Sequence, residues 1–213
     1  QKERRIAAYH EAGHAIVGKT VPNGDPIHKI SLVSRGMALG FTWSLPEEDR
    51  RMQTKSHFED EISQLLAGRV AEELVFGEIT TGASNDIERA TQIGRDMVMI
   101  YGMSKLGTIA YGDRQDTIFG RGPELRNYSE KQAELIDDAV KEILMTQKDR
   151  AKTILTQQAA LLEATAQYLL KEETIEGADF DSLYASFQPK ASRARAKKIS
   201  KPAAKAVDTA LSV

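Results

Sequence analysis

Two histidines and a glutamate near the start of the chain have the spacing of a zinc hydrolase. Residues 10–14 read H-E-A-G-H. Histidines four residues apart lie on one face of an α-helix, about 40° and about 6 Å from each other, so both imidazoles can bind one metal ion. Glu11 lies about 100° around the helix from His10, where its carboxylate reaches a metal-bound water without being a ligand. The pattern predicts zinc held by His10 and His14, with Glu11 as the general base that activates this water for attack on a carbonyl.

The same stretch also matches a nucleotide-binding pattern. Starting at Gly13 and ending at Thr20, the chain reads G-H-A-I-V-G-K-T, which fits G-x-x-x-x-G-K-[ST]. A phosphate-binding loop needs a strand before it and backbone N–H groups that are free to meet the phosphate. The residues before Gly13 instead have helical periodicity, so these amides would bond to carbonyls four residues earlier. A P-loop-type nucleotide-binding module is therefore kept as the alternative function.

Zinc needs a third protein ligand, and the spacing of residues leaves its identity open. The chain has no cysteine, so the ligand is a histidine, an aspartate or a glutamate. The other histidines are His28, in a predicted strand, and His57, near an exposed helix start. The carboxylate candidates are Asp86, at the start of a predicted helix, and Glu72 or Glu73, inside another. Residue spacing favours Asp86 only slightly.

Each of these carboxylates also has an ordinary structural explanation. Asn85 can cap the third predicted helix, and an acidic residue such as Asp86 in the first turn is stabilised by the helix dipole. The two glutamates of the second helix can form ion pairs near Arg69. The third ligand is thus undecided at this level.

The elements that must position these residues are mainly α-helical. Apolar residues recur at helical spacing over 1–19, 54–76, about 87–100, 129–171 and 180–187. A break near 153–158 predicts that the fourth segment folds into an antiparallel helical hairpin. Alternating residues over 27–34, followed by the run 38–45, predict a small sheet or hairpin, and 108–111 is a further short strand candidate. The predicted fold class is mainly α, a helical metal-binding domain with a small β-hairpin or sheet.

The length and composition of the chain indicate one folded domain and a tail. With 213 residues, of which 41% are hydrophobic, the chain can form one well-buried domain, predicted at 1–188. No apolar run approaches the roughly 20 residues of a membrane span, so the chain is expected to be soluble. From Pro189 onward there are seven lysines and arginines against one aspartate, and no aromatic residue. Residues 189–213 are therefore predicted to be a basic, disordered tail without specific nucleic-acid binding.

Several segments resemble, in order, the peptidase module of FtsH-type AAA proteases. They are residues 10–15, 39–42 with 45–49, 68–74, 81–90 and 101–104. The resemblance covers residue 1 to about 185, so the domain at 1–188 is expected to be a zinc metalloprotease domain, while the tail matches nothing in that family. It implies one Zn²⁺ per chain, bound by His10, His14 and Asp86, and Glu11 as the catalytic base. The resemblance therefore favours Asp86 over Glu73 as third ligand.

The resemblance also implies what the module does. It would be an endopeptidase that hydrolyses unfolded or misfolded polypeptides in protein quality control, as part of a homohexamer. ATP would be used only by an ATPase module, expected upstream together with a membrane anchor, so these residues would be a piece of a longer, membrane-associated protein. The peptidase would lie on the cytoplasmic face in bacteria, or on the matrix or stroma side in organelles. A catalytically inactive ring-forming scaffold is a further alternative.

The sequence also suggests where a peptide substrate could dock. Leu39, Gly40, Phe41 and Thr42 lie in the second predicted strand. An extended peptide can add to the exposed edge of a sheet through backbone hydrogen bonds, with little selectivity for side chains. An ordinary buried hairpin is the alternative interpretation of this stretch.

Overall fold

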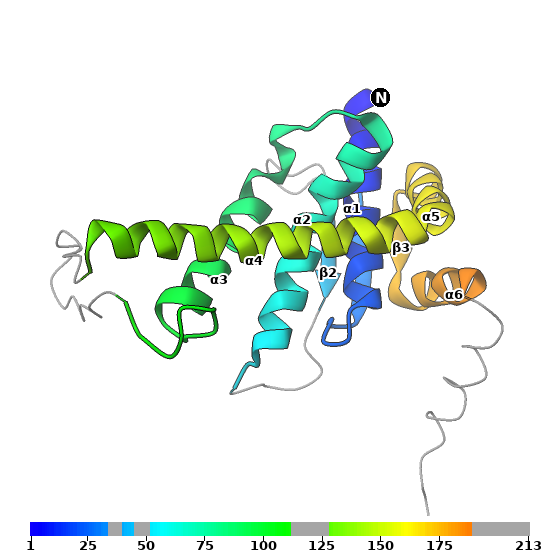
Figure 1. The fold of residues 1–213 in the computed structure, drawn as a ribbon. Coiled ribbons are helices and arrows are strands. Elements are labelled where there is room, and N and C mark those ends of the chain that lie inside the picture. The colour runs from blue at the N-terminus through cyan, green and yellow to red at the C-terminus, as the bar shows by residue number, and fades with distance from the viewer. Residues whose placement is uncertain (34–39, 45–51, 112–127, 189–213) are drawn as a thin grey trace, which may run out of the picture.

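The computed structural model describes residues 1–33, 40–44, 52–111 and 128–188. These residues form six α-helices and a three-stranded antiparallel sheet, which confirms the predicted mainly α fold (Figure 1). The helices are α1 (Lys2–Thr20), α2 (Lys55–Phe76), α3 (Ser84–Met99), α4 (Glu130–Gln157), α5 (Ala159–Glu172) and α6 (Gly177–Phe187), and the 3-10 turn η1 (Thr81–Ala83) precedes α3. Within the described ranges, each helix is too short or too polar to cross a bilayer. The predicted tail at 189–213 and the Leu39 position lie outside the described residues.

Helix α1 lies at the centre of the fold. It contacts α2, α5 and the strands β1 and β2, and all of its residues from Ala7 to Gly18 are buried. Small side chains allow α2 to approach closely: a Cβ atom at Gly13 would lie 2.8 Å from the carbonyl oxygen of Ala67 and 2.9 Å from the Cβ of Ala71. Because nothing larger fits at this crossing, the helix face that carries the histidines is pressed against α2.

The sheet lies beside α1 and has the strand order β2-β1-β3. Its strands are β1 (Ile27–Ser31), β2 (Phe41–Ser44) and β3 (Thr174–Glu176), and both neighbours of β1 run antiparallel to it. Ile30 of β1 pairs with Thr42 on one side and with Ile175 on the other. Both isoleucines are buried in the main core, which fixes the register because a slip of one residue would turn them to the other face. The predicted hairpin is thus confirmed, with β3 as an additional strand.

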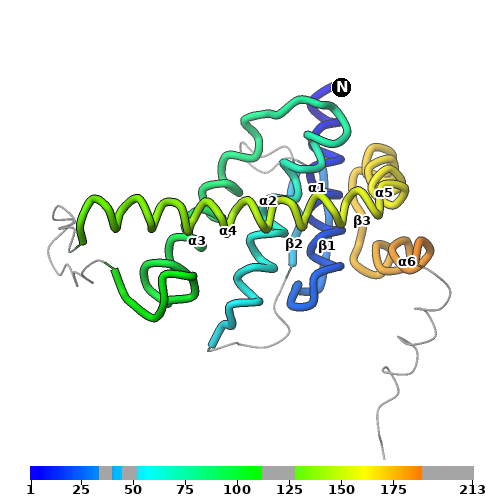
Figure 2. Tube along the Cα trace, viewed as in Figure 1, coloured from blue at the N-terminus to red at the C-terminus, as the bar shows by residue number. Residues whose placement is uncertain are grey.

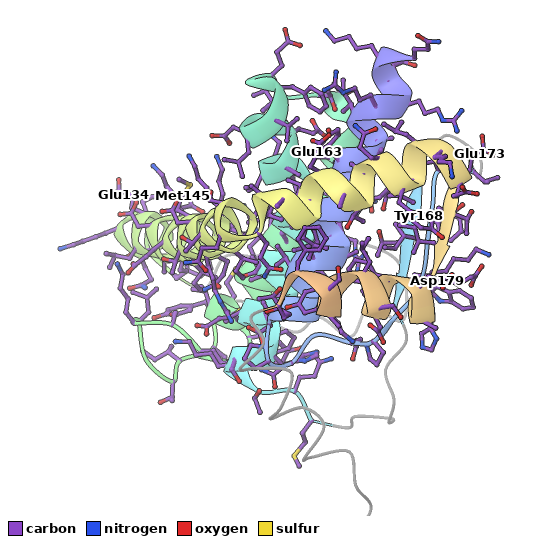
Figure 3. The ribbon with its side chains drawn as sticks, turned by 90° about the vertical axis from the view of Figure 1, so that its right-hand side faces the viewer. Glu134, Met145, Glu163, Tyr168, Glu173 and Asp179 are labelled. Atoms are coloured by element: carbon purple, nitrogen blue, oxygen red, sulfur yellow. The ribbon has the colours of Figure 1, made fainter. Side chains whose placement is uncertain are left out.

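The long helix α4 crosses α2 and α3 (Figure 2). The predicted break is present, at Gln158, but the predicted antiparallel hairpin is wrong. Figures 1 and 3, which view the chain from directions 90° apart, both show α5 turning away from the line of α4, and it packs on α1 instead. The strand predicted at 108–111 is also wrong, because these residues form a loop in which the N–H of Tyr111 donates to the carbonyl of Met99.

Candidate metal centre

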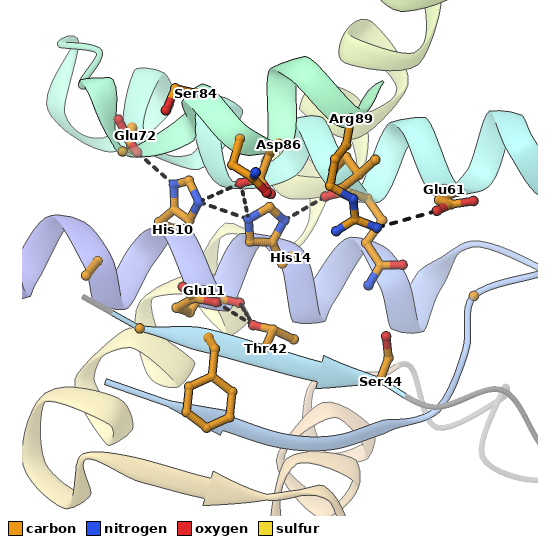
Figure 4. Close-up of a pocket in the computed structure, with 18 of the residues that line it drawn as sticks. His10, Glu11, His14, Thr42, Ser44, Glu61, Glu72, Ser84, Asp86 and Arg89 are labelled. Carbon is orange, nitrogen blue, oxygen red and sulfur yellow. Dashed lines mark hydrogen bonds and ion pairs between the residues drawn. The ribbon is translucent and has the colours of Figure 1, made fainter. Parts of the chain in front are cut away.

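Three side chains from two helices bring their metal-binding atoms together beside α2 (Figure 4). Nε2 of His10 lies 2.9 Å from Nε2 of His14, and Oδ2 of Asp86 lies 3.2 Å from the first nitrogen and 3.3 Å from the second. Zn–N and Zn–O bonds of about 2.0–2.1 Å in tetrahedral geometry separate two ligand atoms by about 3.3 Å. The donor set and its spacing therefore fit a zinc ion.

The backbone of α2 leaves room for this cluster at one residue, Gly68. A Cβ atom there would lie 2.5 Å from Nε2 of His10 and 2.6 Å from Nε2 of His14. Any larger side chain would occupy the space of the imidazoles. The glycine thus lets the two histidines lie directly against the helix backbone.

Both histidines are oriented by hydrogen bonds at their other ring nitrogen. Nδ1 of His14 donates to the carbonyl oxygen of Gln64 at 2.8 Å, which leaves the lone pair of Nε2 for a metal. Nδ1 of His10 lies 2.7 Å from Oε1 of Glu72, whose other oxygen accepts a hydrogen bond from the N–H of Thr80 at 3.0 Å. Glu72 is only 1% exposed. It therefore supports the imidazole from behind rather than joining the group of donor atoms.

Glu73, the next residue along α2, points elsewhere. Its carboxylate pairs with Lys148 of α4 at 2.8 Å, and this contact lowers its pKa. Neither His28 nor His57 belongs to the cluster. Of the candidates for a third ligand, only Asp86 among the described residues lies close to both Nε2 atoms.

The cluster favours positive charge. Burial opposes protonation of His10, but its hydrogen bonds to Asp86 and Glu72 outweigh burial and raise its pKa to about 9. Burial alone would raise the pKa of Asp86, yet the two histidines hold it well below the usual value for an aspartate. The pKa of Glu72 is likewise lowered, because His10 offsets the effect of burial. Two ionised carboxylates thus flank the imidazoles, which is an environment that attracts a cation.

Asp86 reaches the cluster because of how α3 begins. The helix starts at Ser84, directly after η1, so Asn85 already lies within the first turn and the predicted Asn85 cap is wrong. The start of α3 has no side-chain cap; Thr80 caps the preceding turn η1, where its hydroxyl accepts from the N–H of Gly82. Asp86 therefore projects from the first helical turn toward α1.

Glu11 lies on the side of α1 that faces β2 (Figure 4). Its side chain is buried, and Oε2 accepts a hydrogen bond of 2.7 Å from the hydroxyl of Thr42. A cleft runs along α1 from Glu3 past the histidines to Asn23, and Gly40, Phe41 and Thr42 line its β2 side. Glu11, the two histidines and strand β2 thus border one cleft.

Residues 13–20 form part of α1, so their backbone N–H groups are used within a helix. The glycine cradle of a P-loop is therefore absent from this stretch. Lys19, which would contact phosphate in that alternative, forms an ion pair of 2.8 Å with Asp181 of α6.

The sequence profile of peptidase family M41 matches residues 1–183. The chain belongs to this family. It is 48% identical over 193 residues to the ATP-dependent zinc metalloprotease FtsH 1 of Sphaerobacter thermophilus, an overlap that covers 89% of this chain and 30% of the relative. It is 50% identical over 181 residues to the ATP-dependent zinc metalloprotease FtsH of Thermotoga maritima, which covers 83% of this chain and 30% of that protein. The M41 chain thus spans about a third of the length of the curated relatives it matches.

Sequence reasoning did not find three contributors to this M41 centre, namely Gly68, the supporting role of Glu72, and the bond from Thr42 to Glu11. One signal was available for the first two. Gly68 and Glu72 are four residues apart, so they share the face of α2 that meets α1. The Thr42 contact joins residues 31 apart and follows no local pattern.

Proposed function

We propose that this chain is a zinc-dependent endopeptidase with one Zn²⁺ bound by His10, His14 and Asp86. The observation that carries the proposal is the convergence of these three donor atoms, 2.9–3.3 Å apart, beside the buried carboxylate of Glu11. The names of the M41 relatives, which are zinc metalloproteases, support the same chemistry.

In this proposal the residues of the chain divide the work of hydrolysis. Zinc, when bound, lowers the pKa of a water molecule and polarises the scissile carbonyl. Glu11 accepts the proton of the attacking water and delivers it to the leaving amine nitrogen. Glu72 and the carbonyl of Gln64 hold the two imidazoles in the tautomers that present Nε2.

The cleft favours an extended substrate. Glu11 is only 7% exposed, so a folded protein surface cannot reach it, whereas a single extended chain can lie in the cleft. β2 is one of the two outer strands of the described sheet and lines the cleft, and we propose that Gly40, Phe41 and Thr42 bind the peptide by strand addition. Leu39, which we predicted for the same role, lies outside the described residues.

We further propose that the full-length protein is an ATP-driven, membrane-anchored homohexamer that degrades unfolded or misfolded polypeptides. An upstream ATPase module would deliver the chains, and the peptidase would face the cytoplasm in bacteria or the matrix or stroma in organelles. The ATP-dependence in the names of the relatives, and their greater length, support this arrangement.

The test uses the zinc-loaded full-length protein and an unfolded, casein-like substrate with ATP. We expect about one zinc per peptidase chain, and Glu11→Gln should keep the zinc but lower cleavage by about 10²–10⁴-fold, since it removes a general base. If the wild type cleaves no better than Glu11→Gln, the chain is an inactive scaffold. ATP affinity of the 213-residue chain that disappears on Lys19→Ala would instead support the nucleotide-binding alternative.

A further inference from the structure

Strand β2 meets α1 at the side chain of Glu11. The Thr42 hydroxyl lies 2.7 Å from Oε2 of this glutamate and 3.2 Å from its backbone oxygen. A hydroxyl has one hydrogen to donate, and the shorter, charge-assisted bond to the carboxylate takes it. This bond uses Oε2 and does not involve Oε1.

Gly40 approaches the same carboxylate from the lead-in to β2. A Cβ atom at this residue would lie 2.9 Å from Cγ of Glu11, 3.0 Å from its Oε1, and 3.0 Å from the carbonyl oxygen of Ser31. Residues two apart in an extended chain face the same way, so Gly40 and Thr42 both face Glu11. The carboxylate thus fits between the bare backbone of Gly40 and the hydroxyl of Thr42.

The position of Thr42 is itself fixed. Thr42 pairs with Ile30, which is fully buried, and this pairing sets the position of the hydroxyl along α1. A glutamate side chain has three rotatable bonds, and a displacement of about 1 Å of a catalytic group can cost about 10²-fold in rate. Because the pairing with buried Ile30 fixes the Thr42 hydroxyl, its hydrogen bond restricts the rotation of the Glu11 side chain.

We propose that Thr42 is a positioning residue for the general base, Glu11. The absence of a side chain at Gly40 lets strand β2 come close enough to α1 for the Thr42 hydroxyl to reach the carboxylate. The hydroxyl of Thr42 holds Oε2 of Glu11 and so fixes the orientation in which the carboxylate meets the attacking water. The inference rests on the proposed peptidase function and gives β2 a role in catalysis separate from peptide docking.

The experiment compares Thr42→Val, which keeps the shape of the side chain without the hydroxyl, with Thr42→Ser, which keeps the hydroxyl. Both are measured in the zinc-loaded full-length protein with a short fluorogenic peptide. We expect Thr42→Val to lower kcat by about 10–100-fold with KM within about twofold and zinc content unchanged, and Thr42→Ser to recover most of kcat. Thr153→Val is the matched control, because this exposed threonine of α4 likewise uses its hydroxyl as a donor, in this case to the backbone carbonyl of Asp149 at 2.9 Å. The kcat of Thr153→Val should equal that of the wild type.

Two results would overturn the proposal. One is a Thr42→Val protein with unchanged kcat, or with a raised KM alone, since this would make the hydroxyl a contact to the peptide. The other is a Thr42→Ser protein as impaired as Thr42→Val, which would assign the effect to the methyl group.

A further comparison separates this inference from the proposed function. In a Glu11→Gln background, adding Thr42→Val should cause no additional loss, because the group it positions is already gone. An additional tenfold loss would refute positioning while leaving the peptidase assignment intact. If Glu11→Gln alone leaves cleavage unchanged, the proposed function itself fails.

Discussion

Gly68→Ala tests whether the close approach of α2 is what permits the metal centre. The added Cβ atom would lie 2.5–2.6 Å from three ring atoms, Cε1 and Nε2 of His10 and Nε2 of His14. Ordinary contacts of this kind begin at about 3.4 Å, so the rings or the helix must move by about 0.8–0.9 Å. Metal–ligand distances tolerate only about 0.2 Å. A single methyl group therefore exceeds the tolerance of the centre several-fold.

We expect Gly68→Ala to weaken zinc binding at least 100-fold, which corresponds to about 2.7 kcal/mol. The assay is competition against a chromogenic zinc chelator, at constant pH, with zinc stoichiometry measured after dialysis. Circular dichroism of the metal-free protein would check that the helices remain, since alanine is favoured over glycine inside a helix by about 1 kcal/mol.

Gly94→Ala in α3 is the matched control. It is the same substitution inside a helix, but the new Cβ atom would lie 3.5 Å from its nearest neighbour, the Cγ1 of Val140. Zinc affinity should not change, and the melting temperature should stay equal or rise. If Gly68→Ala binds zinc as tightly as Gly94→Ala does, the steric argument for the centre is refuted.

Four further predictions concern the ligand set, the protonation of His10, the role of Glu72 and the tail. Asp86→Asn should release zinc on dialysis and Glu73→Gln should retain it; the reverse result would show that the third ligand is wrongly assigned. In the metal-free protein the raised pKa of His10 stabilises the fold fully below about pH 6.5, and this contribution is lost as the pH rises through about 9. Zinc must displace the proton on His10, so zinc affinity measured by chelator competition should rise about tenfold per pH unit between pH 7 and pH 9. A zinc affinity that does not change with pH would contradict this coupling between zinc binding and proton release. Glu72→Gln should lower zinc affinity about 10–100-fold and flatten this profile, because it removes a carboxylate that holds the proton on His10. Deleting residues 189–213 should leave zinc content unchanged and the melting temperature within about 2 °C; a larger drop would show that the tail packs on the domain.

The sequence predicts the helices well where their signals are local. Helix α2 begins directly after Thr54, whose side chain caps it, and ends directly before Gly77, which adopts a left-handed conformation. Such capping residues and the 3.6-residue periodicity between them can be read directly from the chain. The two histidines of one helical turn follow from the same local geometry.

Features that depend on distant partners could not be predicted in this way. The three-residue strand β3 is too short for a periodic pattern and forms because β1 is beside it. The direction of α5 after Gln158 depends on packing against α1 rather than on the break itself. Neighbouring residues on a helix point about 100° apart, so Glu72 reaches His10 while Glu73 reaches Lys148, and only the orientation of α2 in space decides between them.

The ligands of the proposed zinc site come from distant parts of the chain. His10 and Asp86 are 76 residues apart in the chain, and they belong to α1 and α3, which are separated by the whole of α2. An ion held by both would act as a cross-link that closes this long loop, much as a disulfide does. The resulting restriction of the unfolded chain is equivalent to about 4.5 kcal/mol. The same ion that activates water would then also fasten the first turn of α3 to the centre of the domain, so chelation should loosen that end of α3 before the rest of the fold.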